Sequence, residues 1–505
     1  MKLSLLLSLL MLSSANGYSQ KSFNLESYQK VCIKHSYPNL SDNVASKLIN
    51  SDSVYTILQN RTRTVSTSSY KDVTVTAPGT LAQALGSDAD IIDSLVVRGP
   101  INDNDFNTIW SATFHGNLAV VNLEHAVIEN GKIPKDAFWH QREQLNEDWT
   151  VIRAICLRKI ILPEGLTEIG DGAFSYAINL ESVNIPSSLR KLGVYSFSDC
   201  IALKTSPLIL PEGLEKIPAA CFLNCESLSE VSLPSTVRYI GEIAFYGAKI
   251  NKVNFKEGLQ TMETAAFYAT NLEEVVLPES CLEFIGSHHF ALSHKLKKLN
   301  LPSRLTTIPG CFACNDIMLE EVNIPLTVET IESDVFSGCY PLREIALPEG
   351  LREIKSNAFW YCNSVKELVL PSTLTYLGGA SCQYLQLLEA IYCKASVPPT
   401  CDYDPWNKGR NHTFGPISET PGDLCTPNDI PVYVPMGTKH LYETAFGWNY
   451  FKNYIEMDMT GIEDITCGKE PRQDVIYDLT GRRVLLPTQN HLYIRNGKKF
   501  IYKTH

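Results

Sequence analysis

The chain has 505 residues, more than a single hydrophobic core normally supports, which predicts several domains or an elongated repeat array. Apolar residues make up 44% and charged residues 20%, proportions typical of a folded protein that argue against extensive disorder. The formal net charge of −11 argues against a nucleic-acid partner, because binding to phosphates requires a basic surface.

The first residues have the pattern of a signal peptide. Lys2 supplies a positive charge, residues 3–12 are largely apolar, and Ala15 to Gly17 form a small-residue cleavage site. The apolar run is shorter than the roughly 20 residues that span a bilayer, and no later segment qualifies. We therefore expect removal of residues 1–17 and an exported mature chain without a transmembrane segment.

After an N-terminal segment at 18–75, residues 76–160 are expected to form an N-terminal cap with degenerate repeats. The residues around Val73 to Val75 and around Ser94 to Val97 resemble strands, and residues 117–123 resemble a weak repeat strand. A cap is expected because an open stack of repeats would expose apolar surface and unpaired strand edges.

Residues 161–395 repeat with a period of about 23 residues, inside the leucine-rich repeat range. A proline recurs at positions 163, 186, 211, 234, 278, 302, 325, 348 and 371, and Lys256 fills the one vacant place. About eleven residues after each of these positions stands a phenylalanine, at 174, 197, 222, 245, 267, 290, 312, 336 and 359, and Cys382 takes its place in the last repeat.

Each repeat contains the pattern of a short strand that ends at the proline. In the repeat at 272–278, Val275 and Leu277 share one strand face, while Glu274 and Val276 point to the other. The proline removes a hydrogen-bond donor where the chain must turn, and the phenylalanine fills the interior. Stacked units of this kind predict a β-rich leucine-rich repeat solenoid with one continuous core.

Two segments follow the repeats. Residues 396–460 are expected to form a C-terminal cap with an insertion, closed by the strand Pro431 to Pro435 and by large aromatic residues. Residues 461–505 form a separate β-domain, in which residues 475–484 have a strand–turn–strand pattern and residues 491–501 a hairpin with Asn496 and Gly497 at its turn.

The repeat pattern from Leu162 to Phe174 resembles that of BspA-like leucine-rich repeat proteins of bacterial surfaces, and the resemblance extends over roughly residues 76–460. It implies a non-catalytic protein, and in this family some members are adhesins. Residues 461–505 resemble the sorting domains of type IX secretion cargo, which implies a small β-sandwich and a secreted or outer-membrane location in a Gram-negative bacterium. A purely structural β-domain is the alternative for this tail.

The chain has 15 cysteines, which in an exported protein first suggest disulfides, but their positions favour another interpretation. Cys200, Cys225, Cys339 and Cys362 each lie three residues after a repeat phenylalanine, which predicts a ladder of buried, unpaired thiols. Cys401 and Cys425 lie outside this ladder in an insertion rich in glycine and proline, and are candidates for a disulfide.

No arrangement of residues predicts catalysis. His288, His289 and His294 cluster around one repeat phenylalanine but lack the ordered spacing of a zinc site, so we expect a solvated turn and no metal. Asp402 and Asp404 are a weak pattern for calcium. No nucleophile elbow, zinc-protease motif or phosphate-binding loop is present, and we expect neither an enzyme nor a cofactor.

Two surfaces are candidates for binding an extracellular protein or glycan. The first is the outward strand face, whose columns include Glu274, Glu321, Glu344, Glu367, Asn300 and Asn323; its alternative is a face kept polar for solubility. The second is a group of turn aromatics, Tyr246, Tyr268, Trp360 and Tyr361, whose alternative is burial between coils. Protein interaction or adhesion is the leading function; the alternatives are a glycan- or nutrient-binding module and a structural component of a surface layer.

Overall fold

A computed structural model describes residues 69–139, 155–402, 413–415 and 425–459, together with four strands between 476 and 501. The chain divides into two compact units, residues 1–271 and 272–505, which are described in turn. The predicted signal peptide 1–17, and residues 18–68 of the predicted N-terminal segment, lie outside the described residues. Among the described residues, no helix combines the length and the apolar character needed to cross a membrane.

The first unit opens with three long parallel strands and two helices. The strands are β1 (Tyr70–Thr74), β2 (Ser94–Ile101) and β3 (Val120–Ile128); the helices are α5 (Leu81–Leu85) and α6 (Asp103–Phe114), with the 3-10 turns η1 (Gly86–Asp88) and η2 (Glu129–Gly131). The three predicted strand segments are thus confirmed, whereas α6 was not predicted. The capping box of α6 explains its start, because the Asn102 side chain accepts from the Asn104 N–H and the Asp105 carboxylate accepts from the Asn102 N–H.

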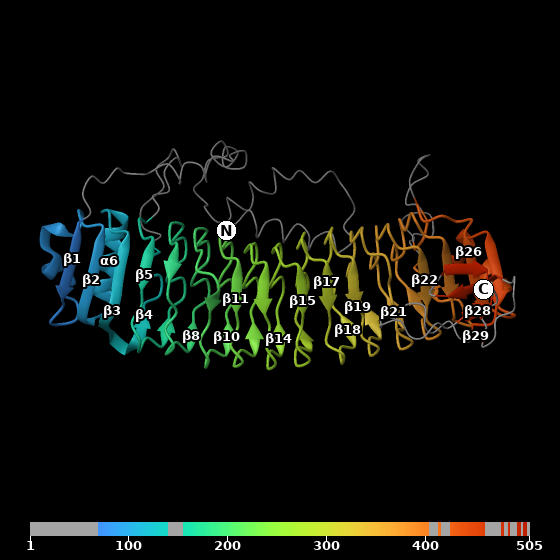
Figure 1. Ribbon diagram of the computed structural model, residues 1–505, viewed down its shortest axis with the longest axis horizontal. Helices are drawn as coiled ribbons and strands as arrows, with labels where there is room; N and C mark the ends of the chain where they lie inside the picture. The colour runs from blue at the N-terminus through green and yellow to red at the C-terminus, as the bar shows by residue number, and fades with distance from the viewer. Residues whose placement is uncertain are drawn as a thin grey trace, which may run out of the picture. The chain divides into compact units, whose positions relative to one another are not determined.

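The rest of the first unit is a β-solenoid in which each coil contributes two very short strands. The first series continues the opening sheet with β5 (Lys159–Ile161) and β7 (Ser182–Val183), and then forms a second sheet from β9 (Leu208–Ile209), β11 (Glu230–Ser232) and β13 (Lys252–Asn254). The second series comprises β4 (Lys132–Ile133), β6 (Glu168–Ile169), β8 (Lys191–Leu192), β10 (Lys216–Ile217), β12 (Tyr239–Ile240) and β14 (Thr261–Met262). All pairings are parallel, since every coil runs in the same direction as its neighbour (Figure 1).

The second unit repeats this plan. Its first series is β15 (Glu274–Val276), β17 (Lys298–Asn300) and β19 (Glu321–Asn323) in one sheet, and β22 (Glu367–Leu370), β24 (Ala390–Cys393), β26 (Pro431–Pro435) and β27 (Asn453–Met457) in another. Its second series is β16 (Glu283–Phe284), β18 (Thr307–Ile308), β20 (Thr330–Ile331), β21 (Glu353–Ile354), β23 (Tyr376–Leu377) and β25 (Thr400–Cys401). The short helix α7 (Lys439–Thr444) and the turn η4 (Trp448–Tyr450) complete the closing segment.

The predicted alternation along the first strand series is confirmed. Val275 and Leu277 are buried, whereas Glu274 and Val276 are exposed on the opposite face. The closing segment also behaves as expected, because Tyr442, Trp448 and Phe451 are buried and the Trp448 indole donates to the Pro399 carbonyl at 2.9 Å.

The described strands of the tail are β28 (Ile476–Asp478), β29 (Arg483–Val484), β30 (Leu492–Arg495) and β31 (Lys498–Ile501). They form one antiparallel sheet in the order β29-β28-β30-β31, and Arg495 pairs with Lys498 across the predicted hairpin turn. The β-sandwich, the capping role of the two ends and the domain boundaries stay predictions.

The repeat phenylalanines form a stacked interior column in the first unit. Successive rings from Phe138 through Phe174, Phe197, Phe222 and Phe245 to Phe267 lie 4.9–5.5 Å apart and nearly parallel. In the second unit the column is interrupted at Phe312, which meets Phe290 at 61° instead of stacking on it. The backbone explains the break, since the Phe290 N–H donates to Phe312 itself, whereas the Phe336 N–H donates to Ala358, the residue before the next phenylalanine. Ala313 therefore occupies the interior place in this coil.

Carboxylates and hydroxyls link neighbouring coils at the turn after the first strand. Where one coil has Pro-Glu and the next has Pro-Ser, the glutamate accepts both from the serine backbone N–H and from its hydroxyl. This inter-coil Glu–Ser pair occurs between Glu164 and Ser187, Glu212 and Ser235, Glu279 and Ser303, and Glu349 and Ser372. Hydrogen bonds with both groups of Ser235 hold the pKa of Glu212 below its ordinary value.

Two turn positions in each coil adopt left-handed backbone angles. The first lies two residues before the interior place, the second two residues after it, and we call them the early and late turn positions. Early positions include Ala220, Ile243, Ala265, His288, Cys311, Asp334 and Asn357; late positions include Asp199, Asn224, Gly247, Ala269, Asn315, Gly338, Tyr361 and Tyr384. Asn, Asp and Gly suit such angles, whereas larger side chains are strained there.

Candidate binding surfaces

The outward strand face of the second unit presents its predicted polar columns, but their charges are partly paired. Glu274, Lys298 and Glu321 lie side by side on β15, β17 and β19, and Asn300 and Asn323 lie beside one another. The Lys298 ammonium is 3.1 Å from the Glu321 carboxylate. The face is therefore polar and extended, with less free negative charge than the sequence alone indicates.

The remaining two predicted glutamates are placed differently. Glu344 is exposed, in a segment to which no strand is assigned, so the sheet of β15, β17 and β19 ends before it. Glu367 begins β22 in the next sheet and is only partly exposed. The predicted columns thus do not form one continuous sheet surface.

Charge pairing also characterises the first unit. The Glu230 carboxylate faces Lys252 at 3.4 Å, and Glu181 bridges Arg158 at 2.5 Å and Lys204 at 2.6 Å. Hydrogen bonds from Lys204 and Arg158 lower the pKa of Glu181. These three groups line a shallow hollow of about 710 Å³ at the starts of β2, β3, β5 and β7, which sequence reasoning missed. Its two carboxylates, Asp93 and Glu181, offset most of the charge of its three cations, Arg158, Lys159 and Lys204.

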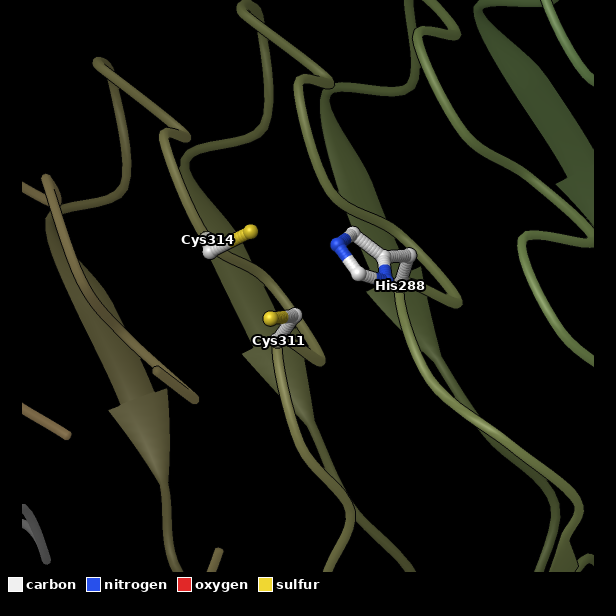
Figure 2. Close-up of side chains that lie close together, drawn as sticks. All are labelled: His288, Cys311 and Cys314. Carbon is white, nitrogen blue, oxygen red and sulfur yellow. The ribbon is translucent and has the colours of Figure 1, made fainter. Parts of the chain in front are cut away.

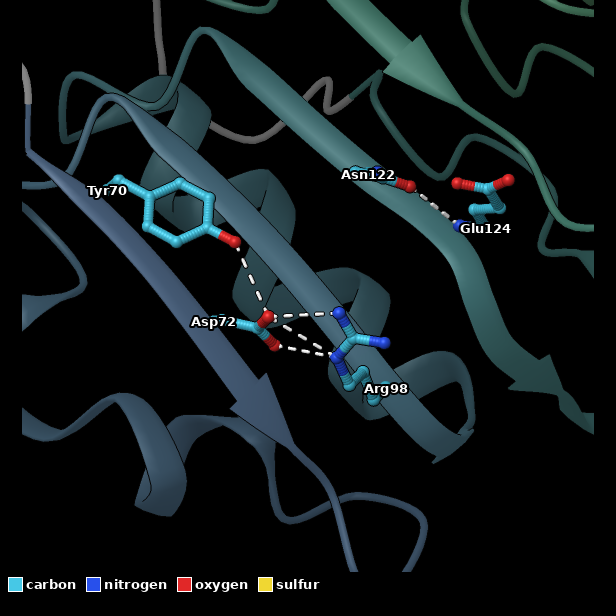
Figure 3. Close-up of polar contacts among 5 residues, drawn as sticks. All are labelled: Tyr70, Asp72, Arg98, Asn122 and Glu124. Atoms are coloured by element: carbon cyan, nitrogen blue, oxygen red, sulfur yellow. Dashed lines mark hydrogen bonds and ion pairs between the residues drawn. The ribbon is translucent and has the colours of Figure 1, made fainter.

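The opening sheet carries a polar group that the sequence analysis did not single out (Figure 3). The guanidinium of Arg98 on β2 donates to both oxygens of Asp72 on β1, with the shortest contact at 2.9 Å, and the Tyr70 hydroxyl donates to the same carboxylate at 3.4 Å. Asn122 on β3 accepts from the Glu124 backbone N–H at 2.8 Å. The hydrogen bond with Arg98 lowers the pKa of Asp72. The Asp72–Arg98 pair links the edge strand β1 to its neighbour β2.

Two of the four predicted turn aromatics are unsuited to binding. Tyr246 and Tyr268 are 5% and 3% exposed, and their rings stack on each other 4.6 Å apart. The interpretation of these two residues as exposed binding aromatics is therefore corrected. Each of the two tyrosines follows an interior phenylalanine directly, and its ring is buried against the ring of the neighbouring coil. The alternative of burial between coils is confirmed.

Trp360 and Tyr361, by contrast, are partly exposed and belong to a larger aromatic turn cluster that also contains Tyr340 and Tyr384. Tyr361 and Tyr384 stack with their ring centres 4.3 Å apart, and Trp360 meets Tyr361 edge-on at 4.3 Å. The Trp360 indole donates to the Gln383 side chain at 3.3 Å, which fixes its orientation. Tyr340 is 43% exposed and lies 6.2 Å from Tyr361.

The backbone makes the two tyrosines at this cluster unexpected. Tyr361 and Tyr384 both occupy late turn positions, with φ near +60°, where most other coils place Asn, Asp, Gly or Ala and one places Leu292. A bulky side chain there costs about 1 kcal/mol or more of backbone strain. Tyr176 shares this position in the first unit and is 37% exposed. Turn geometry alone therefore gives no reason for two adjacent tyrosines.

The expectation of a solvated histidine turn is wrong for two of its three residues. His288 and His289 are buried, and only His294 is exposed. His288 falls on an early turn position directly beside Cys311 of the next coil, and one ligand atom each from His288, Cys311 and Cys314 lies within 4.8 Å of the others (Figure 2). No metal was expected here because the three histidines lack the ordered spacing of a zinc site, and Cys311 and Cys314 come from the next coil.

The protonation of this group is perturbed by its own contacts. A hydrogen bond with Cys314 lowers the pKa of Cys311, and the same interaction together with burial raises that of Cys314. Burial raises the pKa of Asp334, the next early turn residue, to about 6. The Ser287 hydroxyl lies 2.7 Å from Nδ1 of His288.

The cysteine ladder is confirmed as a row of buried thiols. Cys200, Cys225, Cys339 and Cys362 are fully buried and unbridged, and each thiol donates to a backbone carbonyl of the preceding coil at 3.2–3.3 Å. Cys401 and Cys425 are partly exposed. Their disulfide stays a prediction.

Comparison with known proteins identifies the repeats. The family model described as the BspA type leucine rich repeat region matches in six copies over residues 153–260, 204–313 and 309–398. No curated protein matches the chain.

Solved structures of other leucine-rich repeat proteins are similar to this chain. A leucine-rich repeat protein from Bacteroides ovatus is 21% identical with a TM-score of 0.46, over 60% of this chain and 79% of its own. A leucine rich cell surface protein from Faecalibacterium prausnitzii is 20% identical with a TM-score of 0.30, over 47% and 79%. The pneumococcal vaccine antigen PcpA is 19% identical with a TM-score of 0.40, over 73% and 80%. Over residues 153–398, just under half of its length, this chain is therefore similar to the BspA type leucine rich repeat region.

Proposed function

We propose that this chain is an exported, non-catalytic surface protein that binds an extracellular protein, as in adhesion, through its aromatic turn cluster. The family match supports a protein-interaction role, because leucine-rich repeat solenoids present extended surfaces to partners. The signal-peptide pattern of residues 1–17 and the sorting-like pattern of residues 461–505 support export to the outer surface of a Gram-negative bacterium.

The observation that carries the proposal is the pair of tyrosines at left-handed turn positions, Tyr361 and Tyr384, beside Trp360. These rings occupy places where folding favours small or polar residues, and they remain partly exposed. Trp and Tyr are the residues most enriched at the energetic centres of protein interfaces. Because Tyr361 and Tyr384 each use one ring face to stack on the other, the cluster fits a protein partner better than a sugar that needs a free ring face.

The strand face supports the same function in a secondary role. Glu274, Lys298 and Glu321 form a polar, partly self-paired surface on the sheet of β15, β17 and β19. Exposed paired charges at the rim of an interface change association rates and salt dependence more than affinity. We therefore expect this face to guide a partner and the aromatic cluster to hold it.

The test is a binding screen of the full chain against extracellular-matrix and cell-surface proteins and, in parallel, against immobilised glycans. The double change Tyr361→Asn and Tyr384→Asn removes both rings and places a residue that suits the left-handed angle, so the fold should be retained. We expect a saturable protein ligand whose affinity falls at least about 30-fold, the loss of two interface anchors of about 1–2 kcal/mol each.

Tyr176→Asn is the matched control, since it changes the same turn position in the first unit. Equal losses in the control and the double variant would contradict the placement of the site. Binding to glycans alone would favour the nutrient-binding alternative, and silence on both panels would favour the structural one.

A further inference from the structure

One histidine and two cysteines, residue types that commonly bind metal ions, lie close together inside the second unit. His288 comes from the turn after β16, and Cys311 and Cys314 come from the turn after β18, one coil further along. Figure 2 shows the His288 ring facing the Cys314 sulfur, with the Cys311 side chain close to both. Their ligand atoms lie within 4.8 Å of one another, and all three residues are at least nine-tenths buried.

Two features of the fold bring these side chains together. His288 and Cys311 occupy the early turn position of successive coils, so their side chains leave the backbone from stacked places. The one-residue displacement of Phe312 then shifts Cys314 into the place that the buried rings of Tyr246 and Tyr268 occupy elsewhere. In that place the thiol points between coils, toward the histidine.

We propose that His288, Cys311 and Cys314 bind a zinc ion, which links two successive coils of the solenoid. Imidazole nitrogen and thiolate sulfur are the ligands that zinc prefers, and zinc is bound by sets of this composition. Donor atoms around a tetrahedral zinc lie about 3.6 Å apart, given Zn–N and Zn–S bonds of about 2.0 and 2.3 Å. A separation of at most 4.8 Å requires side-chain movements of only about 1 Å.

The surroundings fit a bound cation. The Ser287 hydroxyl contacts Nδ1 of His288 at 2.7 Å, which leaves Nε2 as the metal-binding nitrogen and orients the ring in the way that outer-shell partners orient zinc ligands. Asp334 follows Cys311 at the next early turn position and interacts electrostatically with both Cys311 and His288. Binding releases the thiol protons, so two thiolates balance the charge of the ion and the fourth coordination place is left to water or to this carboxylate.

The test uses the full chain, reduced and freed of metal under anaerobic conditions, with Zn²⁺ and Co²⁺ as probes. We expect it to retain one zinc ion against a weak chelator, to show a thiolate-to-cobalt charge-transfer band with tetrahedral cobalt bands, and to melt at higher temperature with zinc than without. Cys311→Ala, Cys314→Ala and His288→Asn should each lower zinc affinity by at least about 100-fold, and Ser287→Ala by about 10-fold.

Cys362→Ala is the matched control, because Cys362 is an equally buried thiol that lies outside this group. It should bind zinc as tightly as the unchanged chain, and His288→Asn should remain folded because asparagine suits the left-handed angle. Three results would overturn the proposal. They are a folded, reduced chain without the cobalt band, zinc retention by the alanine variants, and a Cys311–Cys314 disulfide formed although zinc was present throughout.

Discussion

The stacked phenylalanine column makes a quantitative prediction about the first unit. Phe222 is fully buried, with its ring 5.5 Å from that of Phe197 and 5.3 Å from that of Phe245. Phe222→Ala leaves a cavity and removes two aromatic contacts, and should cost about 4 kcal/mol of unfolding free energy. Phe222→Leu keeps most of the volume and should cost about 1.5 kcal/mol or less.

Hydrogen exchange is the appropriate assay, because a solenoid opens locally and need not unfold in one step. The Phe197 amide donates to Cys221, and the Phe222 amide donates to Ala244, so both amides report on these coils. A loss of about 4 kcal/mol should accelerate their exchange by about three orders of magnitude, at 1.4 kcal/mol for each tenfold.

Coils of a solenoid contact only their neighbours, so the effect should fade with distance along the stack. Phe138 lies three coils before Phe222, and its amide donates to Ala173. The substitution should accelerate exchange of the Phe138 amide much less than exchange of the Phe197 amide. The reasoning fails if the alanine and leucine variants lose equal stability, or if Phe138 and Phe197 respond alike.

Three further predictions concern the turns, the strand face and the thiols. The pKa of Glu212 is lower in the folded than in the unfolded chain, so this residue stabilises the fold above about pH 4.5 and loses that contribution as the pH falls through the folded pKa. Glu212→Gln should therefore make the free energy of urea unfolding depend less on pH on the acid side. An unchanged pH dependence would contradict the role of Ser235. Lys252→Glu, opposite Glu230, should cost less than about 1 kcal/mol in urea unfolding, since exposed pairs contribute little, and a larger loss would show that the pair is not solvated. Cys225 should resist alkylation in the folded chain and react only after unfolding, because burial raises its pKa well above the ordinary value; mass spectrometry showing rapid native labelling would refute this.

Much of the fold is predictable from spacing because the repeat states the same pattern many times. Val275 and Leu277 alternate with polar neighbours, and that alternation alone assigns their strand face. Single departures from the pattern are harder to interpret. Phe312 follows Ile308 by four residues, whereas Phe336 follows Ile331 by five, so the displacement was visible in the sequence but its effect on Cys314 was not.

The candidate sites were less predictable, because exposure and contact depend on neighbouring coils. Tyr246 and Trp360 each follow an interior phenylalanine directly, yet the first is buried and the second partly exposed. His288 and Cys311 are 23 residues apart, and only the stacking of coils makes them neighbours. Phe414 was likewise missed: it lies within the insertion, but the Cys382 amide donates to Thr413, so Phe414 takes the interior place of a further coil.

The inter-coil Glu–Ser pairs have a consequence for how such a gene can change length. Glu164 accepts a hydrogen bond from Ser187 one coil later, and Glu212 accepts one from Ser235. In this part of the chain a coil with the glutamate and the following coil with the serine thus form a couple. A duplication or deletion of one whole couple, about 46 residues, would leave the remaining carboxylates matched. Loss of only the coil that carries Ser187 or only the coil that carries Glu212 would instead set two glutamates or two serines against each other, so recombination that preserves these pairs should add and remove such coils in twos.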